Sequence, residues 1–492
     1  MSAAAVAAKE VLWTAEEARQ ATGGRNTRDW QATGVSIDSR SLEAGDLFVA
    51  LKGPSFDGHD FAGKAIKAGA AAAMIHRRTE SVDEAMPLLI VDDTFAALWR
   101  LGTAARERST ARLVAVTGSV GKTGTKEALR LCLSPQGLTS ASIGSFNNHW
   151  GVPLSLARME RQAVYGIFEL GMNNPGEIRE LTALVRPHVA IITNIEPAHI
   201  GNFNSITDIA DAKAEIFEGM DANGTAVLNR DNALFHHLCT KAEDAGVTRI
   251  LSFGRHKEAD AHLVDCSLHA TCSAVTARIR GQEIDYCLGM PGSHWVMNSL
   301  AVLAAVSAAG ADVVKAAAQL ANLKPLKGRG ELHKVKTAKG AFKLIDDSYN
   351  ANPTSMRAAF EVLGRATVEK GGRRIAVLGD MLELGERSEE MHSGLAGPLE
   401  AAGVDLVFTC GAAMAALHEK LPKKLRGAHE ADSKALAPKV AAAAKPGDSL
   451  LVKGSLGSRM AVIVEALLAL GSADGAAKGT KTANGPKAAN GR

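Results

Sequence analysis

A short glycine-rich turn between an expected strand and an expected helix constrains this chain more than any other feature. The turn reads Thr117-Gly118-Ser119-Val120-Gly121-Lys122-Thr123. The apolar run before it, 112–116, predicts a buried parallel strand, and residues 126–131 predict the start of a helix. In such a turn backbone N–H groups close around phosphates, with the positive end of the helix behind them. The sequence therefore predicts an α/β domain that binds and uses ATP.

Two residues of this turn carry its chemistry. Lys122 would place a positive charge on the β- and γ-phosphates, and Thr123 would offer its hydroxyl to Mg²⁺. The turn has the short form G-x-x-G-K-T, because Val116 stands where the longer phosphate-loop pattern has a glycine. The alternative is a glycine-rich turn with a solvated lysine, and the flanking strand and helix favour the phosphate loop.

Length and composition narrow the class of protein. A chain of 492 residues is too long for one core and suggests about three domains. No apolar run reaches the roughly 20 residues of a membrane span, and the N-terminus lacks the pattern of a signal peptide, so we expect a cytoplasmic protein. The net charge of +3 comes from the C-terminal tail, so the rest of the chain is formally neutral. A neutral body argues against a nucleic-acid partner. The six cysteines form no C-x-x-C pair, and we expect free thiols.

The strand and helix patterns predict an α/β protein with four parts. Residues 1–108 read as a small N-terminal α/β domain, and 109–326 as a central domain whose strands and helices alternate, which implies a mostly parallel sheet. Within it, 249–288 read as an inserted antiparallel sheet. After a Pro/Gly/Lys break, 327–470 read as a Rossmann-like domain without a G-x-G-x-x-G turn. Residues 471–492 are of low complexity and are expected to be disordered.

Polar residues stand at the carboxyl ends of the expected central strands. In open parallel sheets, ligands bind at this edge. Glu169 ends one apolar strand and is a sensible Mg²⁺ ligand, or an ion-pair partner of Lys122. His199 follows the next strand as a metal ligand, a base or a helix cap. Lys213 lies in an expected helix, where composition alone favours a solvated cation. The amides of Asn147 and Asn148 lie in a polar loop that grips a substrate or only shapes a turn.

The C-terminal domain carries a second polar set. Asp346 and Asp347 follow a strand and could hold a ribose or an incoming amine. The alternative is a plain strand-to-helix turn, with Asn352 capping a helix whose first residue is Pro353. Lys453 ends the last strand, either as a second cation at this edge or as a structural lysine.

These motifs, in this order, resemble the Mur ligase family over nearly the whole chain except the tail. The family's phosphate loop has the same short form, so the glycine missing at Val116 agrees with it. The remaining matches are 38–40, 48–53, 58–60, 147–148 with 151–153, 169–173, 193–199, 213–217, 292–294 with 298, 346–352, 379–385 and 453–455.

The resemblance implies ATP and two Mg²⁺ ions as cofactors. Thr123 and Glu169 would hold one ion, while His199 and Lys213 would serve the other, with Lys213 carbamylated by CO₂ into an anionic oxygen ligand. The implied catalytic residues are Lys122, His199, Lys213 and Lys453. The implied ATP-binding residues are Gly118, Ser119, Val120, Gly121, Lys122, Thr123, His294, Asn298, Arg329 and Asp346.

The resemblance also implies an activity, the joining of D-alanyl-D-alanine to UDP-N-acetylmuramoyl-tripeptide through an acyl phosphate, in peptidoglycan precursor synthesis. The N-terminal domain would hold the UDP end, with Ser39, Arg40, Asn147 and Asn148 on that substrate, and the C-terminal domain would bind the amine. We expect a monomer.

Three alternatives remain. A sister ligase adding the third amino acid would carry a D-N-P-[AR] signature, whereas 379–385 read GDMLELG. A folylpolyglutamate-synthetase-like ligase would share the central domain but lack the uridine-binding one. A phosphate-loop switch would hydrolyse ATP without an amine acceptor.

Overall fold

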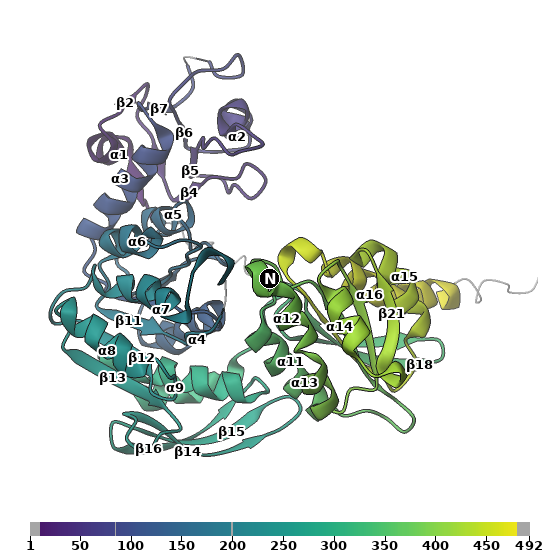
Figure 1. The fold of residues 1–492 in the computed structure, drawn as a ribbon. Coiled ribbons are helices and arrows are strands. Elements are labelled where there is room, and N and C mark those ends of the chain that lie inside the picture. The colour runs from purple at the N-terminus through teal and green to yellow at the C-terminus, as the bar shows by residue number, and fades with distance from the viewer. Residues whose placement is uncertain (1–9, 84, 198–199, 480–492) are drawn as a thin grey trace, which may run out of the picture. The chain divides into compact units, whose positions relative to one another are not determined.

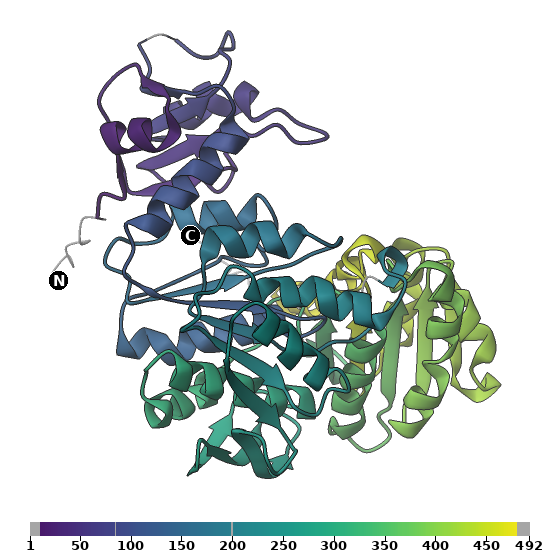
Figure 2. The ribbon, with the colours of Figure 1, turned by 60° about the vertical axis from the view of Figure 1, so that its left-hand side comes forward.

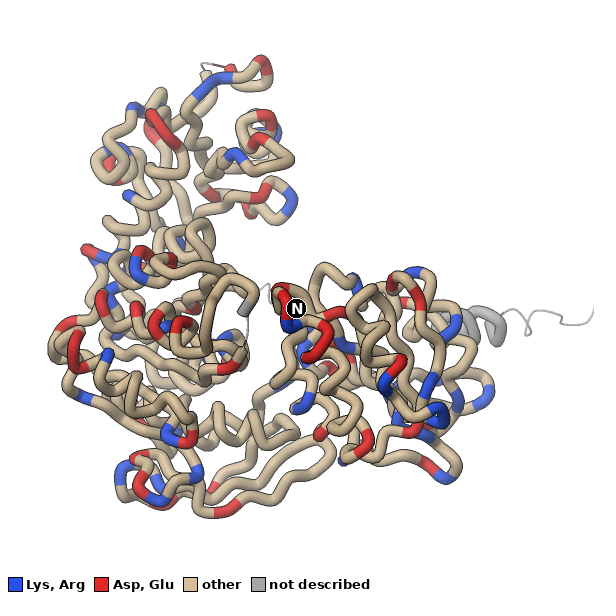
Figure 3. Tube along the Cα trace, viewed as in Figure 1, with Lys and Arg blue, Asp and Glu red and all other residues tan. Residues whose placement is uncertain are grey.

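The structure, a computed structural model, describes residues 10–83, 85–197 and 200–479 (Figures 1 and 2). Its contacts divide the chain into two compact units. The first comprises Met1–Asn194, Ala210–His262 and Ala301–Ala316, and the second comprises Ile195–Ile209, Leu263–Leu300 and Ala317–Arg492. Acidic and basic residues are interspersed along both (Figure 3).

The first unit begins with a small sheet of order β2-β7-β6-β5-β4, parallel except for the β2 edge. The long helix α3 connects this sheet to the central region, and its residues Leu98 and Leu101 share one buried core with Leu154 and Ala157 (Figure 2). The elements are β1 Trp13–Thr14, α1 Ala15–Thr22, β2 Arg25–Asn26, β3 Gln31–Ala32, β4 Gly34–Ser36, β5 Asp46–Val49, α2 Ala62–Lys67, β6 Ala72–Ile75, β7 Leu88–Ile90 and α3 Thr94–Glu107.

The central region of this unit is a parallel sheet in the order β13-β12-β11-β8-β10-β9, which confirms the predicted architecture. Glu169 pairs with Val116, and Ile192 pairs with Thr117, so these strands end at one edge. The elements are β8 Arg112–Thr117, α4 Lys122–Leu133, β9 Thr139–Ala141, α5 Gly151–Ala157, β10 Tyr165–Glu169, α6 Glu177–Val185, β11 Val189–Ile192, α7 (Ile206–Ala214) from Ala210 onward, β12 Thr225–Asn229, α8 Phe235–Asp244, β13 Arg249–Gly254 and α10 (Val313–Gln319) up to Ala316.

The expectation of an inserted antiparallel sheet over 249–288 is wrong for its first strand. β13 pairs in parallel with β12, because its buried residues extend the main hydrophobic sheet. β14 (Ala261–Leu268) also starts in parallel beside β13. The antiparallel pairing described is the hairpin of β15 (Ser273–Ile279) and β16 (Gln282–Leu288), whose alternating buried and exposed residues fit a one-sided sheet.

The second unit contains a six-stranded sheet in the order β17-β18-β22-β19-β20-β21, parallel except at β17. Alternate residues of its strands face two separate cores, so apolar helices cover both faces. The elements are the part of α9 (Ser293–Ala308) up to Leu300, β17 Glu331–Thr337, β18 Gly340–Asp347, α11 Pro353–Arg365, β19 Arg374–Gly379, α12 Ser388–Ser393, α13 Ala396–Ala401, β20 Leu406–Cys410, α14 Met414–Lys420, β21 Arg426–Glu430, α15 Ser433–Ala443, β22 Ser449–Lys453 and α16 Ala461–Gly479.

The predicted tail, 471–492, begins inside α16, and 480–492 lie outside the described residues. Among the described helices, none is long and apolar enough to cross a membrane. The predicted boundaries 1–108, 109–326 and 327–470 stay predictions.

Candidate functional site

The phosphate loop joins β8 to α4 in a conformation that depends on two glycines. Gly118 has φ +140° and Gly121 has φ +90°, both in the region that favours glycine. A Cβ on Gly118 would lie 2.0 Å from Thr193 Oγ1. Lys122 is the first residue of α4, and its Nζ donates to Gly118 O at 2.7 Å. The ammonium therefore lies over the loop at the positive end of the helix.

The end of β11 fixes the loop in place. Thr193 Oγ1 donates to Val120 O at 2.6 Å, and Ser119 N donates to Asn194 O at 2.9 Å. Thr193 and Asn194 belong to the sequence motif at 193–199, but their contact with the loop comes from the parallel pairing of β11 with β8.

Glu169 ends β10 at the same sheet edge and is only 1% exposed. Its Oε1 accepts a hydrogen bond from Asn147 Nδ2 at 2.8 Å. Its Oε2 is buried and has no hydrogen-bond partner among the described residues. A buried carboxylate oxygen left without a donor is costly, and a cation would relieve that cost. The alternative interpretation of Glu169, an ion pair with Lys122, stays a prediction; the donor to its carboxylate in the described part of the chain is Asn147.

Lys213 lies near the end of α7 and is 2% exposed. Burial lowers the pKa of its amine well below the ordinary value, and the charge of Lys122 lowers it further. The solvated-cation interpretation of Lys213 is therefore wrong. His199 and its neighbour Ala198 lie outside the described residues.

Sequence reasoning missed Lys126, a fully buried lysine one turn after Lys122 on α4. Its Nζ donates to Ser142 O at 2.6 Å and to Gly144 O at 2.7 Å, and lies 2.7 Å from Glu127 Oε1. Lys126 therefore holds the loop that presents Asn147 to Glu169. The available signal was two lysines four residues apart, because such a pair places like charges on one helix face.

In the second unit, Lys453 at the end of β22 is 2% exposed and forms an ion pair with Asp347. Its Nζ lies 2.6 Å from Asp347 Oδ2 and donates to Asn350 O at 2.9 Å. Burial raises the pKa of Asp347, although the positive charge of Lys453 opposes that rise. Asn352 caps α11 with Pro353 as its first residue, so this part of the turn interpretation is confirmed.

The other predicted nucleotide residues of this unit lie on α9, on β18 and in the loop before β17. His294 Nδ1, on α9, is buried without a hydrogen-bond partner in the described chain, and burial, with a smaller effect of Lys453, lowers the pKa of His294 to about 4. Asn298 follows one turn later. The Arg329 guanidinium lies 4.1 Å from the centroid of the Tyr349 ring. Asp346 Oδ1 accepts from Ser348 N at 3.1 Å.

The predicted UDP-end residues lie in the first unit. Arg40 is highly exposed, and its side chain forms a two-pronged pair with Asp38, at 2.9 and 2.7 Å. Hydrogen bonds from Arg40 lower the pKa of Asp38. Ser39 lies half-buried between them. Asn148 Oδ1 accepts from Gly151 N at 3.0 Å at the start of α5.

Family models match three parts of the chain. The Mur ligase family catalytic domain matches 31–101, the Mur ligase middle domain matches 116–306, and the Mur ligase glutamate ligase domain matches 328–456. Fold and site define a phosphate-loop α/β ligase. The chain belongs to the Mur ligase family.

Several relatives align with this chain over most of their own length. An Escherichia coli K12 protein named UDP-N-acetylmuramoyl-tripeptide--D-alanyl-D-alanine ligase is 38% identical over 88% of this chain and 93% of its own. The structure of an Acinetobacter baumannii UDP-N-acetylmuramoylalanyl-D-glutamyl-2,6-diaminopimelate--D-alanyl-D-alanyl ligase has a TM-score of 0.79 at 31% identity, covering 94% and 100%. The Thermotoga maritima MurF ligase in complex with ADP has a TM-score of 0.71 at 27% identity, covering 89% and 98%.

Proposed function

We propose that this chain is an ATP-dependent ligase that joins D-alanyl-D-alanine to the terminal carboxylate of UDP-N-acetylmuramoyl-tripeptide, in peptidoglycan precursor synthesis. The names of its relatives support the substrates. The observation that carries the chemistry is the buried, partly unpartnered carboxylate of Glu169 at the sheet edge that also holds the phosphate loop. The relatives do not favour a sister ligase or a folylpolyglutamate-synthetase-like enzyme.

The site fits divalent cations. Thr123 and Glu169 would hold one Mg²⁺, and the unpartnered Oε2 of Glu169 supports this assignment. His199 and Lys213 would serve the second. When bound, these ions neutralise the negative charge that accumulates during phosphoryl transfer.

Lys213 would act as a carbamate. Because burial favours the unprotonated amine, its lone pair is free to attack CO₂, which forms an N–C bond and releases a proton. The product is an anion with two oxygens in place of a cation, which suits a metal ligand. A ¹³C carbamate signal from protein held in ¹³CO₂, absent in Lys213→Ala, is the expected observation.

The chain's own residues would prepare an in-line transfer. Lys122 holds the γ-phosphoryl group while the peptide carboxylate attacks phosphorus and ADP leaves. The acyl phosphate is then attacked by the amine of D-alanyl-D-alanine, and inorganic phosphate departs as the amide forms. Lys453 would help to steady the phosphates.

The remaining assignments are proposals of the same kind. The UDP end would be held by Ser39, Arg40, Asn147 and Asn148, and the nucleotide by His294, Asn298, Arg329 and Asp346. The half-buried stack of Arg329 on Tyr349 and the unpartnered Nδ1 of His294 support a planar, polar ligand there. A cytoplasmic, monomeric enzyme is part of the proposal.

Phosphate release tests the proposed function. Release should require both the UDP-tripeptide and D-alanyl-D-alanine, and single amino acids should not replace the dipeptide. Lys122→Ala should abolish turnover while binding of the UDP-tripeptide survives. ATP hydrolysis without any amine acceptor would instead identify a phosphate-loop switch, and a Lys122→Ala variant with near-normal ligation would refute the phosphate assignment.

A further inference from the structure

The loop of residues 142–150, which follows β9 and leads into α5 in the first unit, is held at its two ends. Between them, the apolar side chains of Ile143 and Phe146 are 60% and 38% exposed. At the first end, the buried Lys126 donates to two of the loop's carbonyl oxygens. The other end meets α3, the helix that follows the last strand of the N-terminal sheet.

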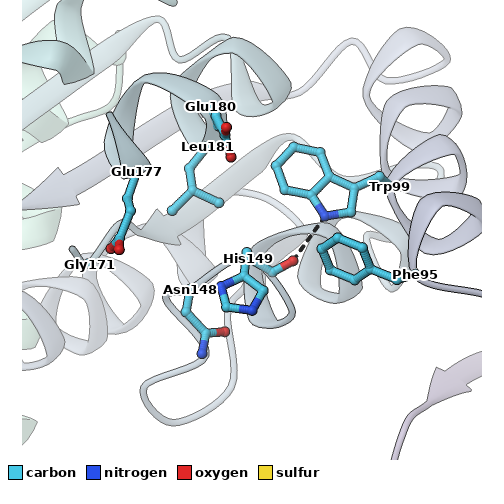
Figure 4. A pocket seen from close by; sticks show the side chains of 8 residues that line it. All are labelled: Phe95, Trp99, Asn148, His149, Gly171, Glu177, Glu180 and Leu181. Atoms are coloured by element: carbon cyan, nitrogen blue, oxygen red, sulfur yellow. Dashed lines mark hydrogen bonds between the residues drawn. The ribbon is translucent and has the colours of Figure 1, made fainter. Parts of the chain in front are cut away.

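Trp99 of α3 holds this second end of the loop (Figure 4). Its Nε1 donates to His149 O at 3.0 Å. The ring of Phe95, one turn earlier on α3, meets the His149 ring edge to face, with the two centroids 5.8 Å apart. A hydrogen bond and an aromatic contact therefore fix His149 to α3.

Two residues before His149, Asn147 contacts the proposed metal ligand. Asn147 Nδ2 donates to Glu169 Oε1 at 2.8 Å, and Asn147 O accepts from Gly171 N at 2.8 Å. The contact needs a glycine, because a Cβ on Gly171 would lie 2.8 Å from Asn147 Cγ. The bond to Oε1 leaves Oε2 buried and without a donor in the described chain. Asn147 therefore fixes the rotation of the carboxylate and, with it, the direction of Oε2.

A pocket of about 570 Å³ lies against the same loop, between α3 and α6 (Figure 4). The residues that line it include Phe95, Trp99, Asn148, His149 and Gly171. Asn148, which stands between the residue tied to Glu169 and the residue tied to α3, is proposed for the UDP-linked substrate. A ligand on Asn148 would restrict the loop, and a restricted loop holds Asn147 on Glu169 for more of the time.

We propose that Trp99 is a positioning residue that couples the binding of the UDP-tripeptide to the binding of Mg²⁺ at Glu169. The inference rests on the proposed function and names a regulation of that site. Trp99 holds His149, the backbone from His149 carries Asn147, and Asn147 orients the carboxylate. Coupling of binding free energies is reciprocal, so each ligand should raise the affinity for the other by the same factor.

Metal binding measured without turnover tests this proposal. Mg²⁺ is titrated by calorimetry into the chain with an ATP analogue whose β–γ bridge is a methylene group, with and without saturating UDP-tripeptide. In the wild-type chain, the UDP-tripeptide should lower the Mg²⁺ concentration for half-saturation by about fivefold or more. Trp99→Phe keeps an aromatic ring but removes the donor to His149. This factor should then fall below about twofold, because one neutral hydrogen bond changes an affinity by about two- to tenfold.

Trp150→Phe is the matched control, because it makes the same substitution on the loop itself. The Trp150 ring packs near His149, but its indole N–H has no hydrogen-bond partner in the described part of the chain. This variant should keep the full coupling factor. A second background separates positioning from a general loss of stability. In Asn147→Ala, the further change Trp99→Phe should leave the factor where it is, because both residues act on one contact.

Three results would overturn the inference: no coupling in the wild-type chain, a factor retained in Trp99→Phe, or a factor lost equally in Trp150→Phe. In each case, phosphate release that depends on D-alanyl-D-alanine would still establish the ligase. Absence of that release would overturn the proposed function and this inference with it. If Trp99→Phe does not fold, Phe95→Leu removes the other contact between α3 and His149. It should lower the factor in the same way, and an unchanged factor would count equally against the inference.

Discussion

Replacing Lys126 by methionine is the sharpest test of how the site is held together. The change keeps an unbranched apolar side chain, one atom shorter, but removes the buried amine that donates to Ser142 O and Gly144 O and pairs with Glu127. Each charge-assisted hydrogen bond contributes about 1.5–3 kcal/mol net, and the relief of burying a charge offsets part of this. We therefore expect the free energy of unfolding to fall by about 3–4 kcal/mol, within the ~3–5 kcal/mol typical of breaking a buried pair.

Arg130→Met is the matched control, because Arg130 pairs with the same Glu127 at 2.8 Å but is 55% exposed. Its loss should cost at most about 1 kcal/mol. Denaturant midpoints followed by tryptophan fluorescence compare the two variants, and Trp150 lies near the held loop. A second readout is catalytic. If the loop moves, Asn147 loses Glu169, and the concentration of Mg²⁺ needed for half-maximal phosphate release should rise in Lys126→Met alone.

A Lys126→Met variant no less stable than Arg130→Met would refute this reasoning, because it would mean that the loop needs no buried cation. Loss of stability with an unchanged requirement for Mg²⁺ would separate the two claims: the ammonium would stabilise the fold without positioning Glu169.

Gly118→Ala should abolish ATP binding, measured by calorimetry, because its Cβ would lie 2.0 Å from Thr193 Oγ1 at a φ of +140°; normal affinity would contradict the loop geometry. Glu169→Gln should lower kcat at least tenfold and raise the Mg²⁺ requirement, since an amide cannot supply the anionic oxygen that Oε2 offers. The pKa of His294 is about 4 in the folded chain against 6.5 in the unfolded chain, so the unfolded chain binds the proton more readily. The free energy of unfolding should therefore fall as the pH drops below 6.5, by up to about 2 kcal/mol at pH 5. His294→Gln should lack that component in denaturation measurements at pH 8 and pH 5, and an identical pH dependence in both proteins would contradict the assignment.

The sequence predicted those parts of the site that follow from local pattern and one topological rule. Apolar runs indicated parallel strands. Because the carboxyl ends of parallel strands meet at one edge of a sheet, the sequence predicted that Glu169 lies near the phosphate loop. The register of Glu169 with Val116 confirms that reasoning. Local pattern was not sufficient for Arg249–Gly254, where short apolar segments joined by turns suggested an antiparallel insert, whereas the strand pairs in parallel with β12.

The pocket beside the site could not be predicted because its walls come from helices about 80 residues apart in the chain. Phe95 and Trp99 lie on α3, whereas Glu177 and Glu180 lie on α6. An aromatic pair and a glutamate pair are each ordinary features of a helix surface. Only the packing of α3 on the central region, through Leu101 and its neighbours, makes them faces of one cavity.

Two buried helical lysines show that the neighbours of a side chain, rather than its residue type, decide its role here. In the sequence, Lys126 and Lys213 are both lysines on helices, for which solvation is the ordinary expectation. Folding buries both, and their surroundings then give them opposite character. Lys126 donates to two carbonyl oxygens and pairs with Glu127, whereas burial, together with the charge of Lys122, lowers the pKa of Lys213 and favours its neutral amine. A charged lysine can hold a loop but cannot attack CO₂, and a neutral one can attack CO₂ but holds a carbonyl less strongly. The proposed division of labour, structural for Lys126 and chemical for Lys213, therefore follows from what lies next to each amine.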